Sequence, residues 1–317
     1  MQTQASALAY AGTMTMAPEE HAALVALLRN LAKGERWGTV TERVLELGSA
    51  VDVWHDKTAD ALLPDPSLSA EFDQAMLDVK EWANAGWHMV GILDDAYPAR
   101  LREIHQAPPF LFAAGTLLPD DRAIAVVGSR KASPRSLDIA SSIAAALANE
   151  HVTVLSGLAA GIDAAAHTAA LEAGGRTVAI IGTGIAKQYP AVNRALQAEI
   201  ERRGLVLSQF WPDAPPQKHN FLMRNAVMSG YGRATVVVEA GEQSGARAQA
   251  RMAVEHGRPV ILTDHVVAAN EWAKSLVERP GVSVAGSMEA VMDQIHRVLD
   301  RENKVDRLLD DLVGAGL

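Results

Sequence analysis

The chain has 317 residues, with 29 basic and 38 acidic side chains, and 49% of its residues are hydrophobic. This balance supplies enough apolar side chains for one large domain and a smaller one, and it excludes disorder along the whole chain. The chain has no cysteine, which excludes disulfides, thiolate metal sites and a cysteine nucleophile. No apolar run reaches the roughly 18 residues of a membrane helix, and no basic segment opens a signal peptide. A cytoplasmic location without a membrane partner is therefore expected.

The N-terminal part of the chain has the pattern of a small helical domain. Residues 1–17 are small and polar and are predicted to form a flexible N-terminus. After them, Leu24, Leu27 and Leu31 recur at spacings of three and four, the period of an amphipathic helix. Because similar spacing continues, we predict an all-helical domain over residues 18–80.

The following residues predict an α/β domain over residues 81–300, with a helical tail over residues 301–317. From Ala123 onward, short apolar runs alternate with helical stretches, as expected for parallel strands that are buried on both faces. The candidate strands are Ala123–Val127, Val152–Leu155, Thr177–Ile181, Leu205–Ser208, Ala234–Val238, Pro259–Leu262 and Val282–Ala285. We therefore predict an α/β fold with a doubly wound, mostly parallel sheet.

Charge is unevenly distributed along the chain. Residues 122–263 hold 15 basic and 10 acidic side chains, whereas the remaining residues hold 14 and 28. A basic central region between acidic ends indicates that the centre meets an anionic ligand. The alternative is that these basic side chains lie on solvated helix faces, and composition alone favours neither.

Three glycine-containing loops follow candidate strands, at residues 128–134, 156–163 and 182–193. Ligands of such sheets bind beyond the carboxyl ends of the strands, where glycine lets the backbone approach and free amides attract phosphate. The first loop adds the forked cation of Arg130. It matches neither a dinucleotide-binding fingerprint nor a Walker A loop. A tight turn with an exposed arginine is the alternative.

The third loop combines a cation with an aromatic side chain. Lys187 and Tyr189 suit a nucleic-acid base and its phosphate, and they equally suit a free nucleotide. A Tyr-Pro turn that opens a helix is the alternative. We expect the strands before Arg130 and Lys187 to be neighbours in the sheet, so that both cations face one crevice.

Catalytic and metal-binding signals are weak. Asp163 and His167 lie four residues apart and could form an acid–base couple, but a helix-capping carboxylate near a core histidine is favoured. Glu239 ends a candidate strand without a clear acidic partner. The ten histidines are scattered, and no metal-binding or nucleophile-elbow motif is present. No catalytic residue and no metal ligand is therefore predicted.

Taken in order, these motifs resemble those of one family. The chain from about residue 20 to residue 262 resembles the DNA-processing protein A (DprA/Smf) family. The resemblance rests on Gly128-Ser129-Arg130, Ser156-Gly157-Leu158-Ala159-x-Gly161-Ile162-Asp163, Ala166-His167, Gly182-x-Gly184, Tyr189-Pro190-x-x-Asn193, Phe221-x-x-Arg224-Asn225, Glu239-Ala240 and Ser244-Gly245. Residues 45–54 are similar to the family's N-terminal helical domain of the sterile-alpha-motif type.

The resemblance implies an extended Rossmann-like fold that binds single-stranded DNA, forms a homodimer and loads a RecA-type recombinase in transformation or recombination. It implies no cofactor and no catalysed reaction. It assigns DNA or phosphate binding to Gly128, Ser129, Arg130, Lys131, Ser156, Gly157, Gly161, Gly182, Gly184, Lys187, Tyr189, Asn193, Arg224, Asn225, Ser244 and Gly245. Arg130 and Lys187 would make the main phosphate contacts.

The sequence departs from the family pattern at several positions. Ala160 and Ala226 stand where the family typically has arginine, and no winged-helix domain is expected after the helical tail. Two other functions therefore stay open. One is a nucleotide sensor that uses the same loops. The other is a phosphoribohydrolase-like enzyme, although the P-G-G-x-G-T-x-x-E motif of such enzymes is absent.

Overall fold

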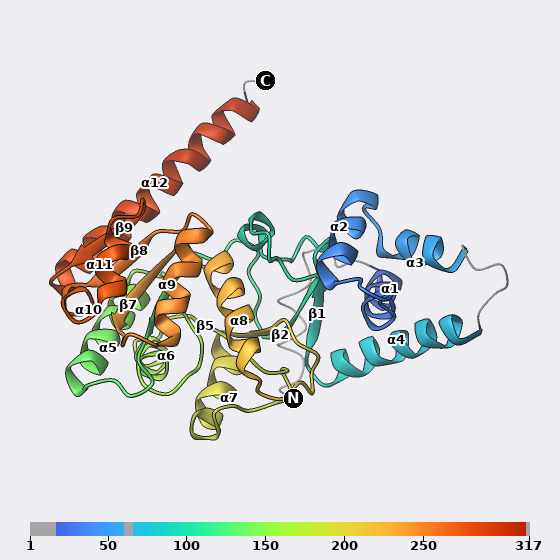
Figure 1. Cartoon of the computed structure of the whole chain (residues 1–317), viewed down its shortest axis with the longest axis horizontal. Coiled ribbons are helices and arrows are strands. Elements are labelled where there is room, and N and C mark those ends of the chain that lie inside the picture. The colour runs from blue at the N-terminus through green and yellow to red at the C-terminus, as the bar shows by residue number, and fades with distance from the viewer. Residues whose placement is uncertain (1–16, 60–65, 315–317) are drawn as a thin grey trace.

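The computed structural model describes residues 17–59 and 66–314. The flexible N-terminus predicted for residues 1–17 lies outside these residues, apart from Ala17. Within them, nine strands form a single sheet with the order β1-β2-β6-β5-β4-β3-β7-β8-β9 (Figure 1). The strands are β1 (His88–Gly91), β2 (Phe110–Gly115), β3 (Ala123–Gly128), β4 (Thr153–Ser156), β5 (Thr177–Ile180), β6 (Leu205–Ser208), β7 (Ala234–Glu239), β8 (Val260–Thr263) and β9 (Val282–Ala285).

The sheet is parallel over most of its width and antiparallel at one edge. From β6 across to β9 every pair is parallel, whereas β2 runs antiparallel to β6 and to β1. The chain moves outward from β3 through β4, β5 and β6, then returns to β7 on the other side of β3. This order is that of a doubly wound, Rossmann-like sheet. It confirms the predicted fold class, and each of the seven predicted strands is present to within one residue at either end.

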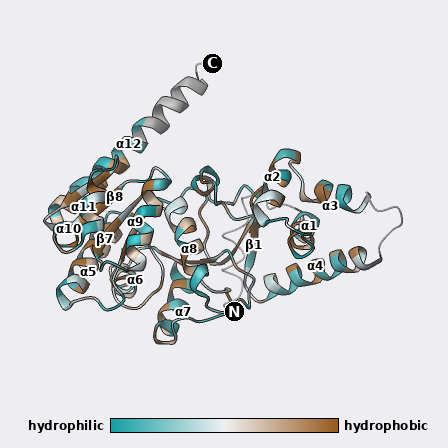
Figure 2. Cartoon of the chain, viewed as in Figure 1, coloured by the Kyte–Doolittle hydropathy of each residue, from teal (hydrophilic) through white to brown (hydrophobic). Residues whose placement is uncertain are grey.

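Helices cover both faces of the sheet. They are α5 (Pro134–Asn149), α6 (Ile162–Glu172), α7 (Arg194–Arg203), α8 (Lys218–Tyr231), α9 (Gly245–Glu255), α10 (Asp264–Ala269), α11 (Glu271–Val277) and α12 (Met288–Gly314). Alternate side chains of β3 enter two buried clusters. Ala125 and Val127 join the cluster that includes α8 and α9, whereas Ile124 and Val126 join the cluster of α5, α6 and α12. Figure 2 shows strands such as β7 and β8 coloured mainly as hydrophobic residues.

Four helices precede the sheet, as the helical pattern of this region predicts. They are α1 (Pro18–Arg29), α2 (Trp37–Leu47), α3 (Ala50–Ala59) and α4 (Pro66–Asn84). Gly48, in the left-handed conformation at φ +70°, ends α2. The predicted domain boundary at residue 80 falls inside α4.

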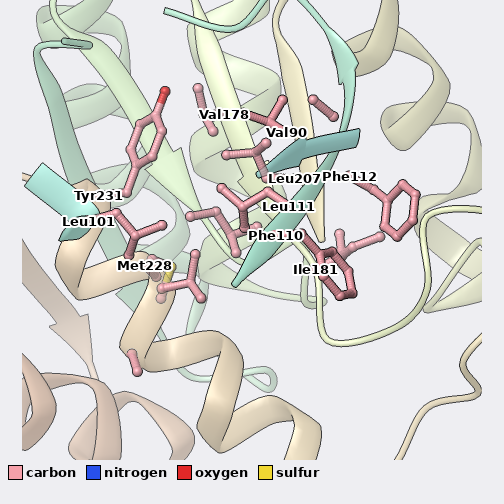
Figure 3. Close-up of a cluster of buried hydrophobic side chains, with 14 of the residues drawn as sticks. Val90, Leu101, Phe110, Leu111, Phe112, Val178, Ile181, Leu207, Met228 and Tyr231 are labelled. Carbon is pink, nitrogen blue, oxygen red and sulfur yellow. The ribbon is translucent and has the colours of Figure 1, made fainter. Parts of the chain in front are cut away.

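The helical region and the sheet share one hydrophobic core. The Trp37 ring lies 5.3 Å from the Phe110 ring, and the Trp82 ring lies 4.9 Å from the Phe112 ring. The same buried cluster extends from α1 and α3 through β1 and β2 to α8. Figure 3 shows its central part, where Phe110 and Phe112 lie among side chains from the sheet and α8. Independent folding of residues 18–80 stays a prediction, and separation would expose this shared surface.

The last helix, α12, has 27 residues, so the predicted boundary after residue 300 falls inside it. Glu302 of α12 pairs with Arg233, which precedes β7, at 2.6 Å. It also pairs at 3.0 Å with Arg100 of the short 3-10 helix η1 (Ala99–Glu103). The first part of the predicted tail is thus tied to the sheet. None of the helices within residues 17–59 and 66–314 combines the length and the apolar character of a membrane-spanning segment.

Candidate nucleic-acid interface

The loop after β3 begins the candidate site at the carboxyl edge of the sheet. It leads from Gly128 to Ser133, which caps α5 because its hydroxyl accepts the Ser136 N–H. Glu239, at the end of β7, accepts hydrogen bonds from the Ser133 amide and hydroxyl at 3.1 and 2.7 Å. Burial raises the pKa of Glu239, but hydrogen bonds from Ser136 and Ser133 outweigh it and hold the pKa below its usual value. This carboxylate therefore braces the loop.

Two glycines let the first and second loops touch. Gly161 has a φ of +81°, and a Cβ there would collide with the carbonyl oxygen of Ser129. A Cβ at Gly128 would lie 2.5 Å from the Ile162 side chain. The Ile162 amide donates to the same Ser129 carbonyl at 3.2 Å. These glycines, predicted as phosphate contacts, are therefore needed for packing between the loops.

Asp163 and His167 do not contact each other as an acid–base pair. The Asp163 carboxylate accepts the amides of Gly157 and Ala159 at 3.2 and 3.3 Å, and burial raises its pKa. His167 is fully buried, and its Nδ1 lies 2.6 Å from the hydroxyl of Thr177. Burial lowers the pKa of His167 to about 3, so the ring is neutral at pH 7. Both arrangements support the structural role predicted for these residues.

The third loop packs against the chain that follows β6. A Cβ at Gly182 would lie 2.6 Å from the Phe221 ring, and one at Gly184 would collide with the backbone of Trp211 and Pro212. Both glycines are buried. Close packing therefore explains why glycine stands at both positions. Because both glycines are buried, they do not form an exposed nest for phosphate.

Four of the polar residues predicted to bind DNA are buried and hold the loops in place. The Ser156 hydroxyl donates to Val126 at 2.7 Å, and Asn193 donates to the Leu158 carbonyl at 2.9 Å. Asn225 donates to the Gly245 carbonyl at 3.4 Å. Arg224, only 6% exposed, donates to the Ile180 carbonyl at 2.9 Å. Because these side chains face inward, they favour a supporting role over a surface contact with phosphate.

Arg224 is a cation beneath the loops. Its guanidinium fills the space beside Gly157, where a Cβ would collide with it. Burial lowers the pKa of Arg224, and the negative charge of Asp163 opposes that shift. We refer to Asp163, His167, Asn193 and Arg224 as the buried polar set.

An exposed row of three side chains lies above these loops. The Arg130 guanidinium lies 5.4 Å from the centre of the Phe221 ring, and the Tyr189 ring lies 5.9 Å from the Phe221 ring. Arg130 is exposed, Phe221 is half-buried and Tyr189 is 41% exposed. Among the described residues, Arg130 has no carboxylate within 4 Å. We call Arg130, Phe221 and Tyr189 the surface row.

Phe221 is a candidate that sequence reasoning did not include among the site residues. Its signal is its place three residues before Arg224, at the start of α8. Leu222 and Met223, which follow it, are 53% and 45% exposed. The first two turns of α8 therefore expose apolar side chains, and the ring of Phe221 among them lies against Arg130, which is an unusual surface for a helix that faces only water.

The expected adjacency of the strands before Arg130 and Lys187 is wrong. β4 pairs with both β3 and β5 and lies between them, because each crossover places the next strand one position further out. Lys187 is 43% exposed and pairs with the 90% exposed Asp213 at 3.3 Å. It belongs to the same loop as Tyr189. Whether it faces the same crevice as Arg130 stays a prediction.

The remaining predicted residues lie at the rim. Lys131 is exposed next to Arg130, and its amide donates to the Ser129 hydroxyl at 3.1 Å. Ser244 caps α9 by accepting the Arg247 N–H, and Gly245 is exposed. In the part of the chain that the structure describes, no group of three or more histidine, aspartate or glutamate side chains could hold a metal ion.

A doubly wound sheet whose carboxyl edge carries a cation and two aromatic rings defines a Rossmann-like protein with a loop-built surface at that edge. Residues 88–296 match the family described as DNA recombination-mediator protein A. The chain belongs to this family, which confirms the resemblance of its motifs.

Individual relatives agree with this assignment. The DNA processing protein DprA of Streptococcus pneumoniae is 45% identical over 171 residues, which are 54% of this chain and 60% of the relative. The Bacillus subtilis protein is 34% identical over 178 residues, 56% of this chain and 60% of the relative. The chain thus spans three fifths or less of the length of these curated relatives. The X-ray structure of S. pneumoniae DprA matches with a TM-score of 0.67 and 31% identity, covering 88% of this chain and 98% of that one.

Proposed function

We propose that this protein binds single-stranded DNA along the surface row. The observation that carries the proposal is the stack of Arg130 on Phe221, with the Tyr189 ring beyond it. Aromatic faces stack on unpaired bases, and a guanidinium without an acidic partner is free to grip a phosphate. A row of both kinds suits a strand whose bases are exposed, and it suits a duplex poorly because paired bases have no free faces.

Relatives support this ligand. The matching curated proteins are named DNA processing proteins, and the Helicobacter pylori protein, which has a similar fold, was described for its single-stranded DNA binding mode. The basic balance of residues 122–263 points the same way. We further propose, from the family resemblance, a homodimer and a RecA-type recombinase as partners, acting in the cytoplasm in transformation or recombination.

The positions of two carboxylates, Asp163 and Glu239, favour a binding protein over an enzyme. Asp163 accepts backbone amides, and Glu239 accepts from Ser133, so each is already engaged in holding a loop. A carboxylate that acts as a general acid or base must lie within hydrogen-bond reach of its substrate. We therefore prefer a binding protein to a phosphoribohydrolase-like enzyme.

The proposal is tested by fluorescence anisotropy with a labelled poly-dT strand at several salt concentrations. We expect Arg130→Ala to weaken binding and to make the log–log salt slope shallower by about 0.7, the value for one phosphate on a single strand. Arg202→Ala is the matched control, because Arg202 lies near the end of α7, which leads into β6 from the opposite edge of the sheet. Equal affinity and slope for the two variants would overturn the surface row as the DNA site.

A further inference from the structure

A second charged groove lies at the opposite, amino edge of the sheet. Its volume is about 660 Å³, and it is bordered by the residues that lead into β8 and β9, by η1 and by α12. The loops that hold Arg130 follow the carboxyl ends of the parallel strands, whereas Pro259 and Gly281 precede β8 and β9. The groove is therefore separate from the surface row. Figure 1 shows α12 running past β8 and β9.

Four arginines line this groove, against two glutamates. Arg297 and Arg301 lie one turn apart on α12, and therefore on one face of the helix. Arg100 and Arg258 come from η1 and from the turn before β8. Arginine carries several donors in a flat fork, the geometry that suits phosphate oxygens.

The two glutamates are already engaged by arginines. Glu302 pairs with Arg100 at 3.0 Å and with Arg233 at 2.6 Å. Glu103 pairs with Arg258 at 2.7 Å. Neither Arg297 nor Arg301 has a carboxylate within 4 Å in the described part of the chain. The groove thus holds an excess of positive charge that the protein itself does not neutralise.

Crowding of like charges favours a bound anion. Burial lowers the pKa of Arg100, and the nearby cations Arg258 and Arg233 push it in the same direction, although Glu302 opposes them. An anion among these guanidinium groups would relieve the repulsion.

The walls of the groove also admit an uncharged part of a ligand. Val282 and Val298 are half-buried there, above the buried Ile261. A volume of about 660 Å³ far exceeds one phosphate ion and lies within the usual range for organic ligands, roughly 300–1,000 Å³.

We propose that this groove binds a phosphorylated small molecule of about nucleotide size. Arg297 and Arg301 grip its phosphates, with Arg258 on the opposite wall, and the organic part lies against Val282 and Val298. The groove is independent of the proposed DNA site, so either proposal can fail without the other.

Isothermal titration of the full chain with ADP and with inorganic pyrophosphate tests the groove. We expect both ligands to bind the unmodified protein and ADP to bind more tightly, because only ADP reaches the apolar wall. In Arg297→Ala/Arg301→Ala, affinity for both should fall at least about ten-fold, given the strength of charged hydrogen bonds. Arg202→Ala, an exposed helical arginine elsewhere, should leave ADP binding unchanged.

Three results would overturn the proposal. One is no binding of ADP or pyrophosphate at millimolar concentration. Another is an ADP affinity that stays unchanged both in the double variant and in the charge-reversed variant Arg297→Glu. Arg297→Glu alone decides this point if the double variant does not fold. The third is tighter binding of an oligoglutamate peptide than of ADP at the same arginines, which would assign the groove to an acidic protein segment. Poly-dT binding by Arg297→Ala/Arg301→Ala should remain unchanged, which separates this groove from the surface row.

Discussion

The buried polar set and the surface row come from the same loops and neighbouring helix starts, yet their surroundings differ completely. Asp163, His167 and Arg224 are at most 6% exposed and bond to backbone or to side chains of the fold. Arg130 and Tyr189 lie at the surface. The difference teaches that polar residues near a strand end serve two purposes, and that burial separates the residues that shape a loop from those able to touch a ligand. Substitutions should divide in the same way.

The largest effect is expected for Arg224→Ala. The change removes the hydrogen bond to Ile180, opens a cavity beside Gly157 and deprives the buried Asp163 of its nearby cation. Loss of one buried charge partner costs about 3–5 kcal/mol of unfolding free energy. Urea denaturation followed by circular dichroism measures it. Arg130→Ala is the control and should change stability by no more than about 0.5 kcal/mol; a similar loss in both variants would erase the distinction between the two groups.

A smaller loss should follow acidification through His167. The unfolded chain takes up a proton near pH 6.5, whereas the native ring stays neutral down to a pKa of about 3. Below pH 6.5 the unfolded state therefore binds the extra proton, and the free energy of unfolding falls by up to about 1.4 kcal/mol per pH unit. Urea denaturation between pH 7 and pH 5 should show a flatter dependence for His167→Gln than for the unmodified protein. Equal slopes would contradict a buried neutral histidine.

Phe221→Ala sharpens the comparison from the other side. Loss of one stacking platform should weaken poly-dT binding about ten-fold, because base–aromatic stacking contributes about 1–3 kcal/mol per base. The salt slope should not change, since the ring neutralises no phosphate. Anisotropy titrations measure both quantities. Phe221→Trp should keep the affinity, because it keeps an aromatic face. If the weaker binding of Phe221→Ala came with a shallower salt slope and disappeared at high salt, stacking would be refuted.

The smallest effects are expected at Lys187. Its ammonium is half-exposed and forms an ion pair with Asp213, which partly neutralises it. Lys187→Ala should therefore weaken poly-dT binding only about two- to three-fold. Asp213→Asn removes the competing carboxylate and should strengthen binding slightly at low salt. The same anisotropy assay measures both changes. Weaker binding by Asp213→Asn would contradict a role for Lys187 in contacting DNA.

The sheet could be predicted largely from the sequence because its strands are buried on both faces. Runs such as Ala234–Val238 stand out as continuous apolar segments, and they recur as strands. The strand order could not be read in the same way, since apolar runs do not record their neighbours. The position of β4 between β3 and β5 therefore contradicted the expectation that the strands before Arg130 and Lys187 are neighbours.

The loops of the candidate site were predictable in position, and their internal packing was not. Glycines at strand ends located the loops correctly, but the packing of Gly184 against Pro212 joins segments distant in the sequence. Motif spacing places Arg224 near the loops without telling whether its side chain points inward. Phe221 went unassigned because its partner, Arg130, is 91 positions away in the printed sequence and meets it only in the folded chain.

The aromatic contacts between the N-terminal helices and the sheet carry a consequence for detection. The Trp211 ring lies 5.6 Å from Trp37 and 6.1 Å from Trp82, and its backbone rests against Gly184 of the loop that holds Tyr189. These three of the chain's six indoles are half-buried and lie in contact with one another through Trp211. A ligand that shifts the third loop would move Trp211 relative to the other two and alter their emission. We therefore expect the intrinsic tryptophan emission to change when DNA binds at the surface row, without any attached dye.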